Sequence, residues 1–230
     1  ADISQVMEGV NALLDDSIAT DGYRISDPVS VVDLSQVDFE ALRKKFDAGR
    51  KRTIAEQLKG AINTKLQKMV RLNKSRTDFA DKFQKLIDDY NAACIAGNPD
   101  IDDFFGKLVK FTKELDAEER RGIAEQLSEE ELAMFDILAK PDINLDEKEK
   151  NQVKQVARDL LETLKTGKLV LDWRKRQQSR AQVRQAIDIK LDELPRCYTK
   201  EIYKQKCDDV FRHVYDSYYG AGQSIYSQAG

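Results

Sequence analysis

The chain has 230 residues, of which 41% are hydrophobic and 34% charged, and its formal net charge is −3. This length and composition suit a globular fold of one large or two small domains, and only four prolines and eleven glycines favour helices over strands. No run approaches the about 18 apolar residues of a membrane span, and no secretory signal is present, so we expect a cytoplasmic protein without a membrane partner.

The N-terminal part of the chain is expected to begin with a helix. Apolar residues recur at helical spacing from Ile3 to Ile18, and the pattern ends near Asp21-Gly22. The segment 23–34 contains Pro28 and several β-branched residues, and it is the one place where a short extended piece is expected. Ser35 is then predicted to cap a helix over 36–46.

A long apolar seam follows between residues 62 and 94. Its members alternate three and four apart, as in a heptad repeat, but Asn73 and Arg76 interrupt it. The pattern predicts either one helix from Thr53 to Ala96 or two helices with a break over 73–77.

The remaining chain is predicted to be helical between clear start and stop signals. Asn98 precedes a proline and caps one helix, Ser128 and Glu131 form a capping box for the next, and Asp146 opens a helix that ends at Gly167. Another helix is expected from Asp172 to Pro195, followed by a last helix and a flexible tail over 220–230. We predict an all-α fold, a multi-helix bundle with one or two long helices. It forms a single domain over 1–230, with sub-halves 1–97 and 98–230 as an alternative.

The stretch LDWRKRQQSRAQVRQAI, residues 171–187, has an unusual charge pattern. If a helix runs unbroken from Asp172, at about 100° per residue, Trp173 and Val183 belong to its apolar stripe. Arg176, Arg180 and Arg184 then fall on this same side, and Arg174 and Lys175 on the solvent side. A buried guanidinium needs a partner, so we expect either internal acids of 114–149 or the carboxylates or phosphates of an external ligand. The residues predicted to contact a protein partner or DNA are Trp173, Arg174, Lys175, Arg176, Arg180 and Arg184.

Charge is also unevenly distributed along the chain. Twelve basic residues face two acidic ones over 43–77, whereas thirteen acidic residues face four basic ones over 114–149. The two blocks either form separate charged surfaces or neutralise each other inside the fold. In the first case the basic block is a candidate for sequence-independent contact with duplex DNA. The candidates for contact with the DNA backbone are Arg43, Lys44, Lys45, Arg50, Lys51, Arg52, Lys59, Lys68, Arg71 and Lys74.

Motifs for catalysis are not found in the sequence. No glycine-rich loop ends in Lys-Ser or Lys-Thr, and His213 is the only histidine. The three cysteines lack metal-ligand spacing and are interpreted as free thiols. We therefore predict no catalytic residue, no metal site and no cofactor in this part of the chain.

Five stretches carry a family resemblance. They are LLDDSIATDGYRI, MVRLNKSRTDFADKFQKLIDDYN, LVLDWRKRQQSRAQVRQAI, LDELP and YKQKCDDVFRHVYDSYYG, and they extend over roughly residues 10–220. In this order they resemble the helical C-terminal domain of type I restriction enzyme R subunits, the motor and nuclease chains of these complexes.

This resemblance implies a module of a larger enzyme. Nuclease and motor domains, with their ATP and Mg²⁺, are expected upstream, and none of their motifs occurs here. The module is expected to dock the motor subunit onto the methyltransferase core and to help hold duplex DNA. The alternatives are a sequence-independent DNA-binding module and a purely structural spacer behind the motor domains.

Overall fold

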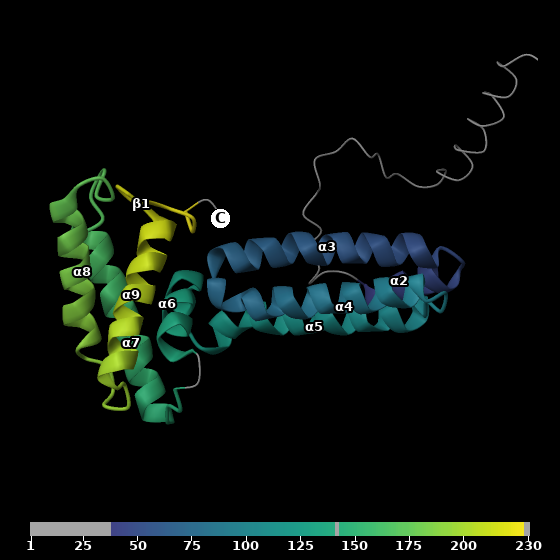
Figure 1. Cartoon of the computed structure of the whole chain (residues 1–230), viewed down its shortest axis with the longest axis horizontal. Helices are drawn as coiled ribbons and strands as arrows, with labels where there is room; N and C mark the ends of the chain where they lie inside the picture. The colour runs from purple at the N-terminus through teal and green to yellow at the C-terminus, as the bar shows by residue number, and fades with distance from the viewer. Residues whose placement is uncertain (1–37, 141–142, 228–230) are drawn as a thin grey trace, which may run out of the picture. The chain divides into compact units, whose positions relative to one another are not determined.

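The computed structural model describes residues 38–140 and 143–227, which belong to one unit, Asp33–Gly230. These residues form eight α-helices, one short 3₁₀ helix and a two-stranded hairpin, which confirms the predicted all-α class (Figure 1). No helix in the described ranges has both the length and the apolar character needed to cross a bilayer. The helix predicted over 3–18 and the extended piece over 23–34 lie outside the described residues.

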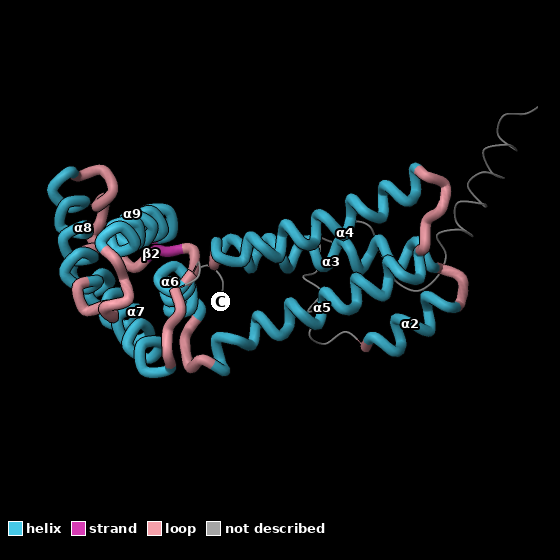
Figure 2. Tube along the Cα trace, turned by 60° about the horizontal axis from the view of Figure 1, so that its bottom comes forward, coloured by secondary structure: helices cyan, strands magenta, loops and turns pink. Residues whose placement is uncertain are grey.

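The first hydrophobic cluster is formed by four helices, α2 (Phe39–Asp47), α3 (Lys51–Leu72), α4 (Thr77–Ile95) and α5 (Ile101–Ala124). Figures 1 and 2 show α3, α4 and α5 running alongside one another, and α2 packs on α3. Aromatic rings tie these helices together. Phe46 of α2 stacks on Phe105 of α5 at 4.1 Å between ring centroids, and Phe83 of α4 stacks on Phe111 at 5.4 Å.

The break between α3 and α4 occurs where the apolar seam is interrupted. Asn73 has extended backbone angles, and its side chain accepts a hydrogen bond from the Ser75 amide, which starts the 3₁₀ helix η2 (Lys74–Arg76). The prediction of two helices is confirmed, and that of one continuous helix is wrong. An asparagine favours this local bond because its side chain competes with the helical backbone for hydrogen bonds.

The second hydrophobic cluster is formed by α6 (Glu129–Ala139), α7 (Glu147–Gly167), α8 (Gln177–Leu191) and α9 (Lys200–Ser217). Each helix packs on the next, and α9 closes back onto α6 (Figure 2). Lys206 of α9 is buried and donates hydrogen bonds to the carbonyls of Ile137, at 2.7 Å, and Lys140 at the end of α6. These bonds satisfy carbonyls that the helix itself leaves unpaired, although burial lowers the pKa of the lysine.

Several predicted helix ends are confirmed and two starts are corrected. The capping boxes at Ser128 and Asp146 are both present, and α7 ends at Gly167. Asp38, not Ser35, caps α2, and Asp100, not Asn98, caps α5. Both aspartates accept hydrogen bonds from amides of the first helical turn, where a carboxylate also interacts favourably with the helix dipole.

The segment after α9 differs from the flexible tail expected over 220–230. Strand β1 (Tyr218–Gly220) pairs with β2 (Gln223–Ser224) in an antiparallel hairpin. The hairpin is held on the second cluster, because the Ala221 amide donates to the carbonyl of Leu169 at 3.0 Å and Ile225 is buried. Residues 228–230 lie outside the described part.

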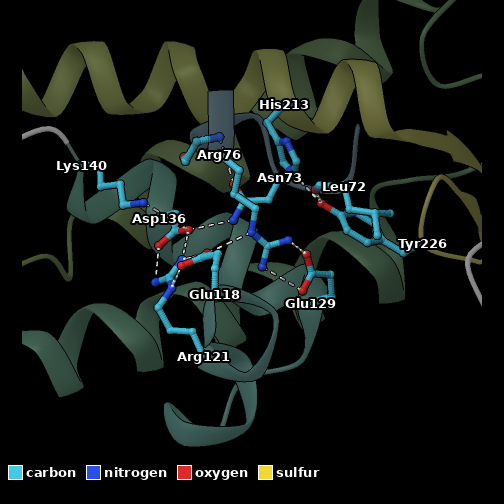
Figure 3. Close-up of polar contacts among 11 residues, drawn as sticks. Leu72, Asn73, Arg76, Glu118, Arg121, Glu129, Asp136, Lys140, His213 and Tyr226 are labelled. Carbon is cyan, nitrogen blue, oxygen red and sulfur yellow. Dashed lines mark hydrogen bonds and ion pairs between the residues drawn. The ribbon is translucent and has the colours of Figure 1, made fainter. Parts of the chain in front are cut away.

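The two clusters meet through polar side chains, here called the junction network. Asp136 of α6 is 1% exposed and accepts hydrogen bonds from the side-chain amide of Asn73 at 2.7 Å and from Arg121 (Figure 3). Arg76 is 2% exposed and pairs with Glu118 at 3.0 Å and with Glu129. The junction network consists of Asn73, Arg76, Glu118, Arg121, Glu129 and Asp136. Since α5 belongs to the first cluster, the division between the clusters lies after α5, not between residues 97 and 98.

Candidate functional site

Trp173 is completely buried but does not belong to a helix. Helix α8 begins only at Gln177, because Asp172 adopts a left-handed backbone with φ of 58° and Arg176 is extended. The indole is instead anchored by α9 and the hairpin. Its Nε1 donates to the Tyr218 carbonyl at 3.1 Å, and its ring packs edge-on against Phe211 and Tyr215. The prediction of an unbroken helix from Asp172, and with it the predicted facing of these side chains, is therefore wrong for residues 172–176.

Arg174 lies on the aromatic residues at the end of α9. Its guanidinium carbon is 4.5 Å from the ring centre of Tyr219 and 5.3 Å from that of Tyr215, within the range of cation–π interaction. Its Nε donates to the Tyr218 carbonyl at 3.0 Å. Gly220, with φ of 97°, lets the hairpin approach the turn before α8, because a Cβ there would lie 2.5 Å from the carbonyl oxygen of Val170.

Exposed apolar side chains lie on the two segments that flank this arginine. Seven large apolar side chains are exposed in the described part of the chain, and four of them belong to these segments: Val170 and Leu171 in the turn before α8, Tyr215 at the end of α9 and Tyr219 in β1. Leu171 is 69% exposed, and the two tyrosines are 39% exposed each. We call these four residues and Arg174 the Tyr–Arg patch. Grouped exposed apolar residues of this kind are typical of protein-binding surfaces.

Two of the three arginines of α8 and its start have internal partners. Arg180 donates to the Arg174 carbonyl at 2.6 Å. Arg184 pairs with Asp208 of α9 at 3.0 Å, and its guanidinium carbon is 3.9 Å from the ring centre of Phe211. The acidic block 114–149 is therefore not the partner of this stripe. Arg176 is exposed at the start of α8, and Lys175, whose side chain is 80% exposed, pairs with Asp172.

Six of the twelve basic residues of the block 43–77 form ion pairs with acidic residues in the described part of the fold. Lys65 is the most buried lysine of the pairs and contacts Asp116 at 2.6 Å and Glu119 at 2.8 Å, both on α5. Although burial opposes its charge, the hydrogen bonds that the Lys65 ammonium donates to these two carboxylates raise its pKa. Neutralisation inside the fold is thus observed for part of the two blocks. The other basic residues with ion pairs are Arg43 (Asp47, Asp102), Lys51 (Asp102), Lys59 (Glu56), Lys74 (Asp216) and Arg76 (Glu118, Glu129).

The other DNA candidates of the block lie on exposed positions of α2 and α3 or directly before α3. They do not form a group with the Tyr–Arg patch, which belongs to the second cluster. The exposed candidates are Lys44, Lys45, Arg50, Arg52, Lys68 and Arg71.

A cavity of about 770 Å³ lies beside the junction network, between the end of α3, the start of α6 and the hairpin. The three glutamates that line it are already paired. Glu119 pairs with Lys65, Glu129 with Arg76 and Glu130 with Lys165. The cavity therefore offers no unpaired carboxylate for chemistry, and the Tyr–Arg patch is the stronger candidate site.

His213 is buried and takes part in a chain of hydrogen bonds (Figure 3). The Tyr226 hydroxyl donates to the Leu72 carbonyl at 2.8 Å and lies 3.1 Å from Nε2 of the imidazole, while Ser217 Oγ lies 3.4 Å from Nδ1. Because the tyrosine proton is used by Leu72, these contacts assign the Nε2–H tautomer of the neutral ring. Burial lowers the pKa of His213 to about 4, the charge of Lys74 acts in the same direction, and Asp216 opposes them.

This histidine makes stability depend on pH. In the unfolded chain His213 has its ordinary pKa of 6.5 and binds a proton more readily than in the folded chain. The stability that comes from burying the neutral ring is therefore fully present above pH 6.5 and is lost as the pH falls toward 4. The expected loss between pH 7 and pH 4 is about 3 kcal/mol. Urea unfolding at closely spaced pH values would measure it. A His213→Phe variant serves as control, and an equally steep decline in that variant between pH 6.5 and 5 would refute the assignment.

Of the residues predicted to contact a partner, Arg174 belongs to the patch, whereas Trp173 is completely buried and supports it from beneath. The apolar members of the patch were not predicted. A signal was present, since Tyr215 and Tyr219 are four residues apart, a spacing that would place both on one side of a helix, although α9 ends at Ser217 and Tyr219 belongs to β1. Leu171 and Val170 gave no signal, because an apolar pair beside a predicted helix is ordinarily buried.

Comparison with known protein families gives a match. The family model described as "Type I restriction enzyme HindI endonuclease subunit-like, C-terminal" matches residues 1–218. Neither the curated proteins nor the solved structures contain a significant match. The family match covers all the helices described above and most of the patch. The chain therefore belongs to the family of C-terminal regions of type I restriction enzyme endonuclease subunits.

Proposed function

We propose that this region is a non-catalytic module that docks the motor subunit onto the methyltransferase core of a restriction complex. ATP and Mg²⁺ are used, in this proposal, by domains upstream of it. Within the described ranges no group of His, Cys, Asp or Glu side chains is arranged to hold a metal ion. The observation that carries the proposal is the Tyr–Arg patch.

The composition and rigidity of the patch support a docking role. Tyrosine and arginine are enriched among the residues that dominate binding energy at protein interfaces. Here both tyrosines are already ordered by Arg174, and Trp173 beneath them is fixed by its bond to the Tyr218 carbonyl. A preordered surface loses little conformational entropy on binding, so its apolar area contributes more fully to affinity.

A Leu171→Asp substitution tests the docking role. Leu171 is 69% exposed in an irregular turn, so the variant is expected to fold normally. A charge at the centre of an apolar contact should weaken binding to the purified methyltransferase core by at least about a hundredfold, since it is desolvated without a partner. Pull-down followed by calorimetric titration would measure the effect.

The matched control is Ile189→Asp, which changes an exposed apolar residue of α8 outside the patch, 59% exposed. This control is expected to bind the core like the wild-type chain. Unchanged binding of the Leu171→Asp variant, with a normal circular dichroism spectrum, would show that the patch does not dock the subunit. In that case a structural spacer role would be favoured.

Duplex DNA contact by the basic block is a second, weaker proposal. The exposed residues Lys44, Lys45, Lys68 and Arg52 are available for phosphates, but six of the twelve basic residues are already engaged with acidic side chains. Each engaged pair reduces the number of counterions that DNA binding can release. We therefore place docking first and DNA contact second.

A further inference from the structure

A rim of positive charge borders the Tyr–Arg patch. Residues 168–180 contain five basic side chains and one acidic side chain, Asp172. Helix α8, which begins within this segment, has no side-chain cap and no acidic residue in its first turn, so the positive end of its dipole adds to the rim. The basic residues are Lys168, Arg174, Lys175, Arg176 and Arg180.

The charges of this rim are not cancelled within the fold. Arg174 and Arg180 are held by backbone carbonyls, of Asp216, Tyr218 and Arg174, which orient the guanidinium groups without neutralising them. The carboxylate of Asp216 is 2.5 Å from Lys74, and so it is engaged elsewhere. Among the described residues, Arg176 has no hydrogen bond or ion pair from its exposed side chain. Lys175 has only the solvent-exposed Asp172, a kind of pair that contributes little.

We infer that the segment of the methyltransferase core that docks here is both apolar and acidic, with carboxylates placed against Lys175 and Arg176. This inference rests on the docking function proposed above and adds the chemistry of the partner. Complementary charge at the border of an apolar contact accelerates association and selects the partner. It predicts a Glu- or Asp-rich segment with leucine-like side chains, such as one face of an amphipathic helix.

The apolar residues of the patch favour a protein partner over DNA. Leu171 and Val170 are the most exposed of the four apolar residues of the patch. Aliphatic side chains at these positions would not contribute to the binding of phosphates. Interfaces with DNA are more polar and more positively charged than protein interfaces. The patch combines a basic border with an aliphatic and aromatic centre, which is the usual composition of a protein interface.

The double variant Lys175→Glu, Arg176→Glu tests the inference. Neither side chain packs in the core, and glutamate is favourable at the start of a helix, so the fold should be retained. Dissociation constants for the purified methyltransferase core would be measured by titration at low and at physiological salt. The double variant is expected to bind at least about tenfold more weakly at low salt than the wild-type chain, and its affinity should depend less on salt.

One control variant and two comparisons, with Leu171→Asp and with duplex DNA, separate the outcomes. Lys110→Glu, Lys113→Glu makes the same charge change on exposed positions of α5 and should leave binding unchanged. If the Lys175→Glu, Arg176→Glu variant binds like the wild type while Leu171→Asp prevents docking, the partner is not acidic and the inference fails alone. If Leu171→Asp also binds normally, the proposed function fails. If the double variant loses affinity for a short duplex DNA but not for the core, DNA occupies the rim and the inference is overturned.

Discussion

An Asp136→Ala variant is expected to lose about 3–5 kcal/mol of unfolding free energy, the range found when one partner of a buried ion pair is removed. The carboxylate is 1% exposed and accepts hydrogen bonds from both Arg121 and Asn73. Alanine would leave the buried side-chain amide of Asn73 without its acceptor. Arg121 would keep Glu118 as its remaining ion-pair partner. The urea midpoint, followed by circular dichroism, measures the loss.

The control for this experiment is Asp103→Ala. Asp103 pairs with Lys107 at 2.7 Å on the surface of α5, and both side chains are more than half exposed. Such pairs contribute at most about 1 kcal/mol, so the control should unfold close to the wild type. Equal effects of the two substitutions would mean that the junction network contributes no more than a surface pair.

A Trp173→Ala variant is expected to be destabilised by about 3–5 kcal/mol, as large aromatic residues in a core usually are on truncation to alanine. The side chain is completely buried between α9 and the hairpin, and its removal leaves a cavity beneath Tyr215. It also deprives the Tyr218 carbonyl of one of its two donors. Thermal unfolding followed by circular dichroism would measure the effect.

Trp173→Phe separates packing from hydrogen bonding at this position. Phenylalanine keeps most of the apolar contact with Phe211 but cannot donate to Tyr218, which still accepts from Arg174. We therefore expect a smaller loss of about 1–2 kcal/mol, comparable with one hydrogen bond and a small cavity. A loss as large as that of the alanine variant would show that the indole bond, not the packing, holds the hairpin.

The helices could be predicted from the sequence because their signals are local. Ser128 with Glu131, and Asp146 with the acidic residue three positions later, form capping boxes within a single turn. The interruption of the seam at Asn73 likewise acts through a bond to the second residue after it. Local signals of this kind do not depend on the rest of the fold, and these predictions are confirmed.

The partners of the arginines could not be predicted because they depend on distant contacts. The left-handed backbone of Asp172 takes Trp173 out of the helix, so helical angles calculated through it lose their meaning. Arg184 pairs with Asp208 only because α9 packs against α8. The count of acidic residues over 114–149 does not include Asp208 and so did not indicate this pair. Likewise, the pairing of Lys65 with α5 follows from the contact of α3 with α5.

The Tyr–Arg patch could be predicted from the sequence only in part. Its residues come from the turn before α8, from the last turn of α9 and from the hairpin, which are separated by more than forty positions in the chain. The sequence indicated Arg174 as a residue that contacts a partner. Which aromatic rings remain exposed is decided by how Trp173 fills the space beneath them, and this is a property of the packed structure.

The two hydrophobic clusters also differ in when they can form during synthesis. All described residues of the first cluster have been synthesised once α5 is complete, at Ala124. The second cluster depends on Tyr218 and on the bond between Ala221 and Leu169, so it must wait for about a hundred further residues. Because domains generally fold as the chain emerges, the first cluster is available as a folded support on which the later helices assemble. The Tyr–Arg patch, which combines residues of the turn before α8 with Tyr215 and Tyr219, is then completed last.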